Sequence, residues 1–103
     1  MKSKLEILVG LLMADAMKVH DYVQLIFEQG IVLSIYNEFR LPNGDDISSL
    51  RGEKLLKAEE KQEEIILHFS NGKSLSIDLR DEAYNGPEAL QLNVPGQLTV
   101  VWN

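Results

Sequence analysis

The chain has 103 residues, enough for one hydrophobic core and a single domain. Hydrophobic residues make up 45% and charged residues 25%, a composition typical of globular rather than disordered proteins. The formal net charge of -6 disfavours binding to nucleic acid or anionic membranes, because phosphate contacts need clustered cations. The absence of cysteine excludes disulfides, thiol catalysis and Cys-based zinc sites, and fits a cytoplasmic protein.

The most apolar stretch comes first, at residues 7–14 (ILVGLLMA). It is too short to span a bilayer, which takes about 20 residues. Asp15 interrupts the region where a signal peptide would carry its cleavage site. We therefore expect a buried element, with no membrane segment and no export signal.

An internal repeat is the strongest feature of the sequence. Residues 8–49 align without a gap to residues 50–91, with 11 identities, where roughly three are expected by chance. The shared frame is LxG, then LxFxxGxxLSI, then Asn-Gly. A partial third copy would occupy residues 92–103. We expect one domain, residues 1–103, in which two similar supersecondary units share a core.

The repeat bears on residues 5–17, which alone could form an apolar helix. Their counterpart alternates Lys54, Leu56 and Ala58 and leads into a clear strand pair. A duplication would place the same element in both copies, which favours a strand over residues 11–19. The alternative is an N-terminal helix packed on a single sheet, and residues 3–8 could form a short helical turn in either case.

Each unit is predicted to contain three antiparallel strands, at about 11–18, 21–28 and 32–38, and at about 54–60, 64–70 and 74–80. A last strand is expected at about 98–102, and residues 89–93 could add another. Alternation with a period of two places one apolar set on the inner face. These core residues are Val23, Leu25, Phe27, Leu33, Ile35, Ile65, Leu67, Phe69, Leu75, Ile77 and Leu79.

The hairpin loops must contain an odd number of residues to keep Phe27 with Leu33, and Phe69 with Leu75, on one face. We predict three-residue loops at 29–31 and 71–73, with Gly30 and Gly72 supplying the positive φ angle. This register pairs residue 26 with 34, 66 with 78 and 68 with 76.

The outer faces of the two units differ in polarity. The second unit presents mostly charged and hydroxyl side chains to water, with Leu55 and Ile66 as exceptions. The first unit presents Leu11, Val19 and six residues predicted to form a partner or homodimer interface: Met13, Met17, Tyr22, Ile26, Val32 and Tyr36. An apolar sheet face of this size needs a cover. The alternative cover is residues 1–8 together with the loops.

Catalytic and metal-binding constellations are weak. His68, Ser76 and Asp78 share an outer face in this register, but no nucleophile elbow or glycine-built oxyanion hole accompanies them. Asp45-Asp46 and Asp81-Glu82 fit no calcium-binding loop, and no nucleotide fingerprint is present. We expect no enzyme, no cofactor and no metal, with a small hydrolase as a remote alternative.

The segment 80–88 (RDEAYNGPE) is long for a hairpin connection, acidic, and contains a tyrosine. A long loop on a rigid sheet can serve as a binding element. The candidate binding residues in it are Asp81, Glu82, Tyr84, Asn85 and Glu88. The alternative is a structural turn in which Asn85-Gly86-Pro87 redirects the chain.

The layout LxG…LxFxxGxxLSIYN, followed by NGPEAL and a closing VVW, resembles small bacterial proteins, some of which are immunity proteins of toxin systems. The resemblance implies a protein-binding role and assigns no residue a function.

The sequence thus predicts an all-β or β-dominated α+β domain: two tandem three-stranded antiparallel repeats plus a C-terminal strand, arranged as a sandwich or a partly open barrel. The predicted function is non-enzymatic protein binding, for example neutralising a basic toxin. The alternative is a structural or accessory homodimer.

Overall fold

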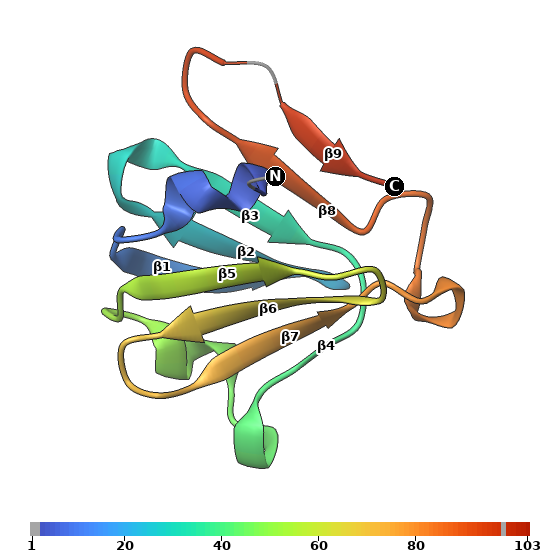
Figure 1. Ribbon diagram of the computed structural model, residues 1–103, viewed down its shortest axis with the longest axis horizontal. Coiled ribbons are helices and arrows are strands. Elements are labelled where there is room, and N and C mark those ends of the chain that lie inside the picture. Colours follow the sequence, from blue (N-terminus) through green and yellow to red (C-terminus); the bar gives the residue numbers. More distant parts are fainter. Residues whose placement is uncertain (1–2, 98) are drawn as a thin grey trace.

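The computed structural model describes residues 3–97 and 99–103 and has two antiparallel sheets stacked as an open sandwich (Figure 1). The first sheet has the order β1 (Met13–Val19), β2 (Tyr22–Phe27), β3 (Val32–Ile35), β8 (Leu90–Asn93) and β9 (Val100–Trp102). The second has the order β4 (Phe39–Arg40), β7 (Ser74–Asp78), β6 (Glu64–Phe69) and β5 (Leu55–Glu60). The predicted all-β class is confirmed, as a sandwich that does not close into a barrel.

Helical structure in the described residues is limited to short 3-10 turns: η1 (Lys4–Leu8), η2 (Glu28–Gly30), η3 (Pro42–Gly44), η4 (Ile47–Leu50) and η5 (Asp81–Ala83). The predicted strand at residues 11–19 is confirmed as β1, so the alternative of a long N-terminal helix is wrong. Within the ranges the structure describes, no helix has the length and apolar character needed to cross a membrane.

The core is formed by residues that recur 42 positions apart. Five such pairs lie on the inner faces of the two sheets with at most 3% of each side chain exposed. They are Val23 and Ile65, Leu25 and Leu67, Phe27 and Phe69, Leu33 and Leu75, and Ile35 and Ile77. Leu79, also expected in the core, lies just beyond β7 and is only partly buried.

The backbone repeats the same spacing where β1 and β5 meet. The Gly10 N–H donates to the Leu55 carbonyl at 2.7 Å, and the Gly52 N–H donates to the Met13 carbonyl at 2.8 Å. Both glycines have positive φ angles, 89° and 84°, which side chains with a Cβ rarely adopt. The two units are thus joined edge to edge by reciprocal hydrogen bonds.

A β-bulge in each unit reverses the face of one residue that was predicted to point outward, Met13 in the first unit and Leu55 in the second. The register of β1 against β2 shifts between Met13 and Asp15, and that of β5 against β6 shifts between Leu55 and Lys57. A bulge adds a residue to one strand and so changes which face the following side chains occupy. Met13 therefore lies fully buried in the core rather than on the outer face, and Leu55, predicted to point outward, is likewise buried.

The hairpin loops begin one residue earlier than predicted. The Phe27 N–H donates to the Ile31 carbonyl, and the Phe69 N–H donates to the Lys73 carbonyl, so the loops are residues 28–30 and 70–72. Residue 26 therefore pairs with 32, 66 with 76 and 68 with 74, and the predicted partners were wrong by two residues. A shift of two keeps every side chain on its predicted face.

The fourth strand of each unit belongs to the sheet of the other unit. β4 follows β3 in the chain but pairs with β7, whereas β8 follows β7 but pairs with β3 (Figure 1). The connections are unequal, residues 36–38 in the first unit and 79–89 in the second. The ungapped alignment of the two units has no structural counterpart beyond this point. Asn43 lies in η3 after β4, whereas Asn85 precedes β8.

The C-terminal end of the first sheet matches the predicted strands in part. The strand expected near residues 89–93 is β8, and the expected last strand is β9, which begins at Val100. Leu98, where that strand was predicted to start, lies outside the described residues.

The described part of the N-terminus packs beside β5 and lines, together with β5 and β9, a hollow of about 490 Å³. Leu5 and Leu8 of η1 are fully buried, and the Ser3 hydroxyl donates to Glu60 at 2.5 Å. The Trp102 indole N–H donates to the same carboxylate at 2.9 Å. Residues 3–8 therefore contribute Leu5 and Leu8 to the core and do not cover the outer face of the first sheet.

Candidate functional site

The outer face of the first sheet carries the remaining predicted interface residues. Met17 is 42% exposed, whereas Tyr22, Ile26, Val32 and Tyr36 are half-buried. A polar row crosses the middle of this face, because Gln24 pairs with Ser34 and Ser34 pairs with Gln91. The face is therefore mixed, with apolar groups on both sides of a polar row, and not apolar almost throughout as predicted.

The two tyrosines meet the predicted binding loop at one end of the sheet. The rings of Tyr22 and Tyr36 are 5.0 Å apart between centroids and tilted by 47°. The Asn85 side-chain amide donates to the Tyr36 carbonyl at 2.9 Å, which fixes the loop beside the rings. Asp21, Asn85, Pro87 and Glu88 line a hollow of about 130 Å³ with the tyrosines, here called the tyrosine pocket.

The loop residues thus divide into two groups. Asn85 and Glu88 line the tyrosine pocket. Asp81 and Glu82 are exposed on η5 and line neither this pocket nor the one described next, and Tyr84 packs against the core. Asn85 both fixes the turn, through its hydrogen bond to Tyr36, and lines a pocket, while a binding role for the segment stays a prediction.

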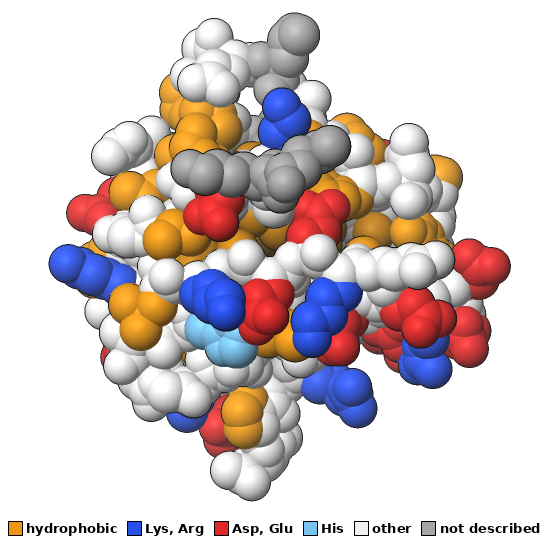
Figure 2. All heavy atoms as spheres, viewed as in Figure 1, with side chains coloured by type: hydrophobic (Ala, Val, Ile, Leu, Met, Phe, Trp, Pro, Cys, Tyr) orange, Lys and Arg blue, Asp and Glu red, His pale blue; other side chains and the backbone are white. Residues whose placement is uncertain are grey.

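A second hollow of about 440 Å³ adjoins the first, sharing Asp21, Tyr22 and Asn85 with it. Four carboxylates line it, those of Asp21, Glu38, Asp45 and Asp46, and we call it the acidic pocket. Figure 2 shows acidic side chains gathered on the right, at the end of the molecule where the segment between β7 and β8 lies.

Asn37 gives the acidic pocket a feature that the sequence did not reveal. The residue lines the pocket, is 2% exposed, and donates through Nδ2 to the Asp78 carbonyl at 2.8 Å. Its Oδ1 has no hydrogen-bond partner among the described residues. A buried amide oxygen without a partner is costly, so it marks a place where a donor would be favourable.

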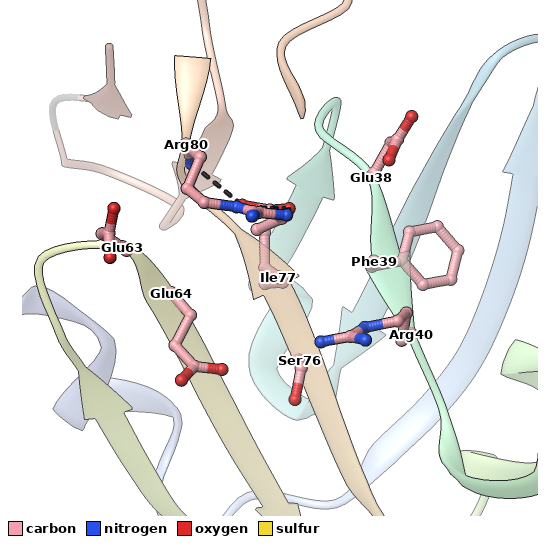
Figure 3. Close-up of a pocket in the computed structure, with 9 residues that line it drawn as sticks. Glu38, Phe39, Arg40, Glu63, Glu64, Ser76, Ile77 and Arg80 are labelled. Carbon is pink, nitrogen blue, oxygen red and sulfur yellow. Dashed lines mark hydrogen bonds and ion pairs between the residues drawn. The ribbon is translucent and has the colours of Figure 1, made fainter. Parts of the chain in front are cut away.

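A third hollow, of about 530 Å³, lies on the outer face of the second sheet (Figure 3). Arg40 from β4 extends toward Ser76, and Glu63 and Glu64 lie across the groove from it. Arg80 makes bidentate contacts to Asp78, with Nη2 to Oδ2 at 2.7 Å and Nε to Oδ1 at 3.0 Å. One of the two guanidinium groups that line the groove, that of Arg80, is thereby paired within the protein.

We expect the Asp78 carboxyl to titrate far below an ordinary aspartate. The hydrogen bonds from the Arg80 side chain and backbone lower the pKa of Asp78 to about 2 from 3.8. The ionised form is favoured in the folded state, so its stabilising effect is complete above pH 4 and is lost as the pH falls toward 2. An NMR pH titration should place the Asp78 midpoint near 2.

Arg80→Gln should raise that midpoint toward 3.8. Arg51→Gln is the matched control, because it removes a guanidinium paired instead with Asp15, at 2.9 Å. An unchanged Asp78 midpoint in Arg80→Gln would contradict the assigned cause.

His68 has different partners from those predicted. Its Nδ1 lies 3.1 Å from the Ser74 hydroxyl and its Nε2 lies 2.6 Å from Glu59, while Ser76 and Asp78 contact other residues. The hydrogen bond from His68 lowers the pKa of Glu59. The corrected register explains the change, since His68 pairs with Ser74 across the strands.

This carboxylate–imidazole–hydroxyl chain lies on an open sheet surface. The strands that carry Ser74 and His68 are both interior to the sheet, although β4 flanks β7 only at Ser76 and Ile77. The arrangement is a polar contact between side chains of β5, β6 and β7.

Within residues 3–97 and 99–103, no group of three or more His, Cys, Asp or Glu side chains is placed to hold a metal ion. No protein-family model matches the chain, and no curated protein or solved structure matches it either. The functional argument therefore depends on the geometry of this molecule.

Proposed function

We propose that this protein is a non-enzymatic protein-binding module whose binding surface is formed by the tyrosine pocket and the acidic pocket. The observation that carries the proposal is that the two pockets adjoin through Asp21, Tyr22 and Asn85. Aromatic rings and carboxylates then share one concave surface. Such a surface suits a partner with exposed arginine and lysine side chains.

The charges around the pockets support a basic partner. The side chains of Asp21 and Glu38 have no hydrogen bond or ion pair within the part of the chain that the structure describes. Unpaired surface carboxylates attract cations over about 8–10 Å at physiological ionic strength and raise association rates. A basic toxin is one partner of this kind, in keeping with the resemblance to immunity proteins.

The proposal is tested with the product of the reading frame next to this gene. That product, if basic, should co-elute with the wild-type protein in size-exclusion chromatography. Asp21→Lys should abolish co-elution, because it reverses a charge shared by both pockets. Glu6→Lys makes the same charge change on exposed η1, outside both pockets, and should leave the complex intact. Equal effects of the two variants would reject these pockets as the binding surface.

A second candidate function, an accessory homodimer, is favoured by exposed apolar groups on the first sheet. Met17 is 42% exposed and Val101 is 39% exposed, on β1 and on β9. Ile26 and Val32 are paired neighbours on the same outer face. A symmetry-related copy would cover these groups by using the same patch on both chains.

Ile26→Glu tests the homodimer. A carboxylate placed inside a self-complementary patch would be buried without a partner, so association should weaken by about 2–5 kcal/mol. Light scattering should then record a loss of dimer mass. Ile66→Glu, the same change on the outer face of the second sheet, should leave the mass unaltered. A wild-type protein that stays monomeric at high concentration would reject the homodimer.

A further inference from the structure

We infer that the acidic pocket binds one arginine side chain of the partner. The inference rests on the proposed function and adds the chemistry of the group that is recognised. Three independent features of the pocket converge on it: an amide oxygen without a donor, free carboxylates, and an aromatic ring.

The amide oxygen comes from Asn37. Its Nδ2 is held by the Asp78 carbonyl, so the side chain cannot rotate to exchange its donor and acceptor without losing that bond. The opposite end of the amide, Oδ1, therefore remains an acceptor without a partner; it is itself buried, so a guest in the pocket reaches it only by displacing the side chains that cover it. The Ser49 hydroxyl is the other buried side-chain oxygen of this kind among the described residues, and it lines neither pocket.

The carboxylates that line the acidic pocket favour a positively charged side chain as the bound group. Asp21 and Glu38 are free of internal partners, whereas the Lys73 ammonium contacts Asp45 at 3.0 Å and Asp46 accepts from the Ser48 hydroxyl at 2.7 Å. Lys18 is the one cation in the pocket lining, and it offsets a single carboxylate. The lining therefore retains a negative charge that a cation would neutralise.

The ring of Tyr22 favours arginine over lysine. A guanidinium is planar, stacks on an aromatic face, and offers five N–H donors to several acceptors at once. An ammonium is a compact point charge with a stronger hydration shell, which it would have to lose in the pocket. The acceptors here belong to an amide and to separate carboxylates, and five donors spread over a plane suit such a set better than a point charge does.

The test is an NMR titration of the isotope-labelled protein with N-acetylarginine amide. Backbone signals of Tyr22, Asn37 and Asp46 should shift. The lysine derivative and the neutral citrulline derivative should bind at least about tenfold more weakly, since charge-assisted hydrogen bonds are lost or fewer. Citrulline matches arginine in shape, so it isolates the contribution of the charge.

Asp21→Asn/Glu38→Gln should weaken arginine binding by about tenfold or more. Asp81→Asn/Glu82→Gln removes the same number of charges from η5, outside the pocket, and should change the affinity by less than about twofold. All four residues are exposed, and the same spectra report whether each variant is folded.

Three results would overturn the inference: shifts confined to the groove of Figure 3, equal binding of citrulline, or equal weakening by both double variants. A neighbouring gene product that binds the wild type while N-acetylarginine amide does not would defeat this inference alone. Arginine binding at the pocket without any protein partner would defeat the proposed function alone.

Discussion

Replacing Phe69 by alanine is expected to lower the free energy of unfolding by about 3–5 kcal/mol. The ring is 2% exposed and lies on the inner face of β6, between the two sheets. Truncation removes buried apolar area and leaves a cavity that the opposing sheet cannot fully close. For a domain of this size the loss is a large part of the total stability. Urea unfolding followed by circular dichroism measures it.

Phe27→Ala is the matched variant, because Phe27 occupies the corresponding position of the first unit and is 1% exposed. It should cost about as much as Phe69→Ala. Phe39→Ala, a truncation of a half-buried ring on the edge strand β4, should cost less. A loss below about 1 kcal/mol for Phe69→Ala would show that the core does not depend on this ring.

Met13→Ala should destabilise the protein by about 2–5 kcal/mol, whereas Met17→Ala should change its stability by less than about 0.5 kcal/mol. The two side chains are four residues apart on one strand, but the bulge turns Met13 inward and leaves Met17 outside. The pair therefore measures the effect of the bulge directly. Thermal and urea unfolding of both variants are the readouts.

Leu55→Ala provides the control in the second unit, since Leu55 precedes the matching bulge and is fully buried. It should resemble Met13→Ala. If Met13→Ala proved harmless to the monomer and instead altered its association, Met13 would belong to an interface, contrary to the structure.

The elements of the fold could be predicted because apolar residues alternate clearly with a period of two and do so in both units. Leu25, Phe27 and Leu33 alternate cleanly, and their counterparts 42 residues later do the same. The repeat also identified β1 as a strand, although its local composition is equally suited to a helix. Local pattern and duplication were therefore sufficient for the class and the core.

The errors came from backbone features that leave little trace in side-chain types. A bulge after Met13 changes the face without changing the composition. A hairpin loop displaced by one residue keeps every face and alters only the partners, which moved His68 from Ser76 to Ser74. The short β4 and its exchange with β8 depend on contacts between sheets, and two residues carry almost no periodicity.

The sequence predicted several residues of the candidate site but not the pocket that joins them. Tyr22, Tyr36, Asn85 and Glu88 were singled out separately, and the fold brings them to one pocket. Asn37 could not be found, because the lack of a partner for its Oδ1 arises only where the chain crosses from β3 to β4. The contact between Glu59 and His68 could not be found either, because it depends on the register of β5 against β6.

The exchange of β4 and β8 between the sheets makes the folding of the two units interdependent. Neither half can complete its sheet from its own chain, so neither gains its full hydrogen bonding while the other is disordered. Contacts of this kind join distant parts of the chain, and forming them is slow and cooperative. Calorimetry should therefore record a single heat-absorption peak with equal van't Hoff and calorimetric enthalpies. A cut in the loop after β4 should leave two fragments that are unfolded apart and refold only when mixed.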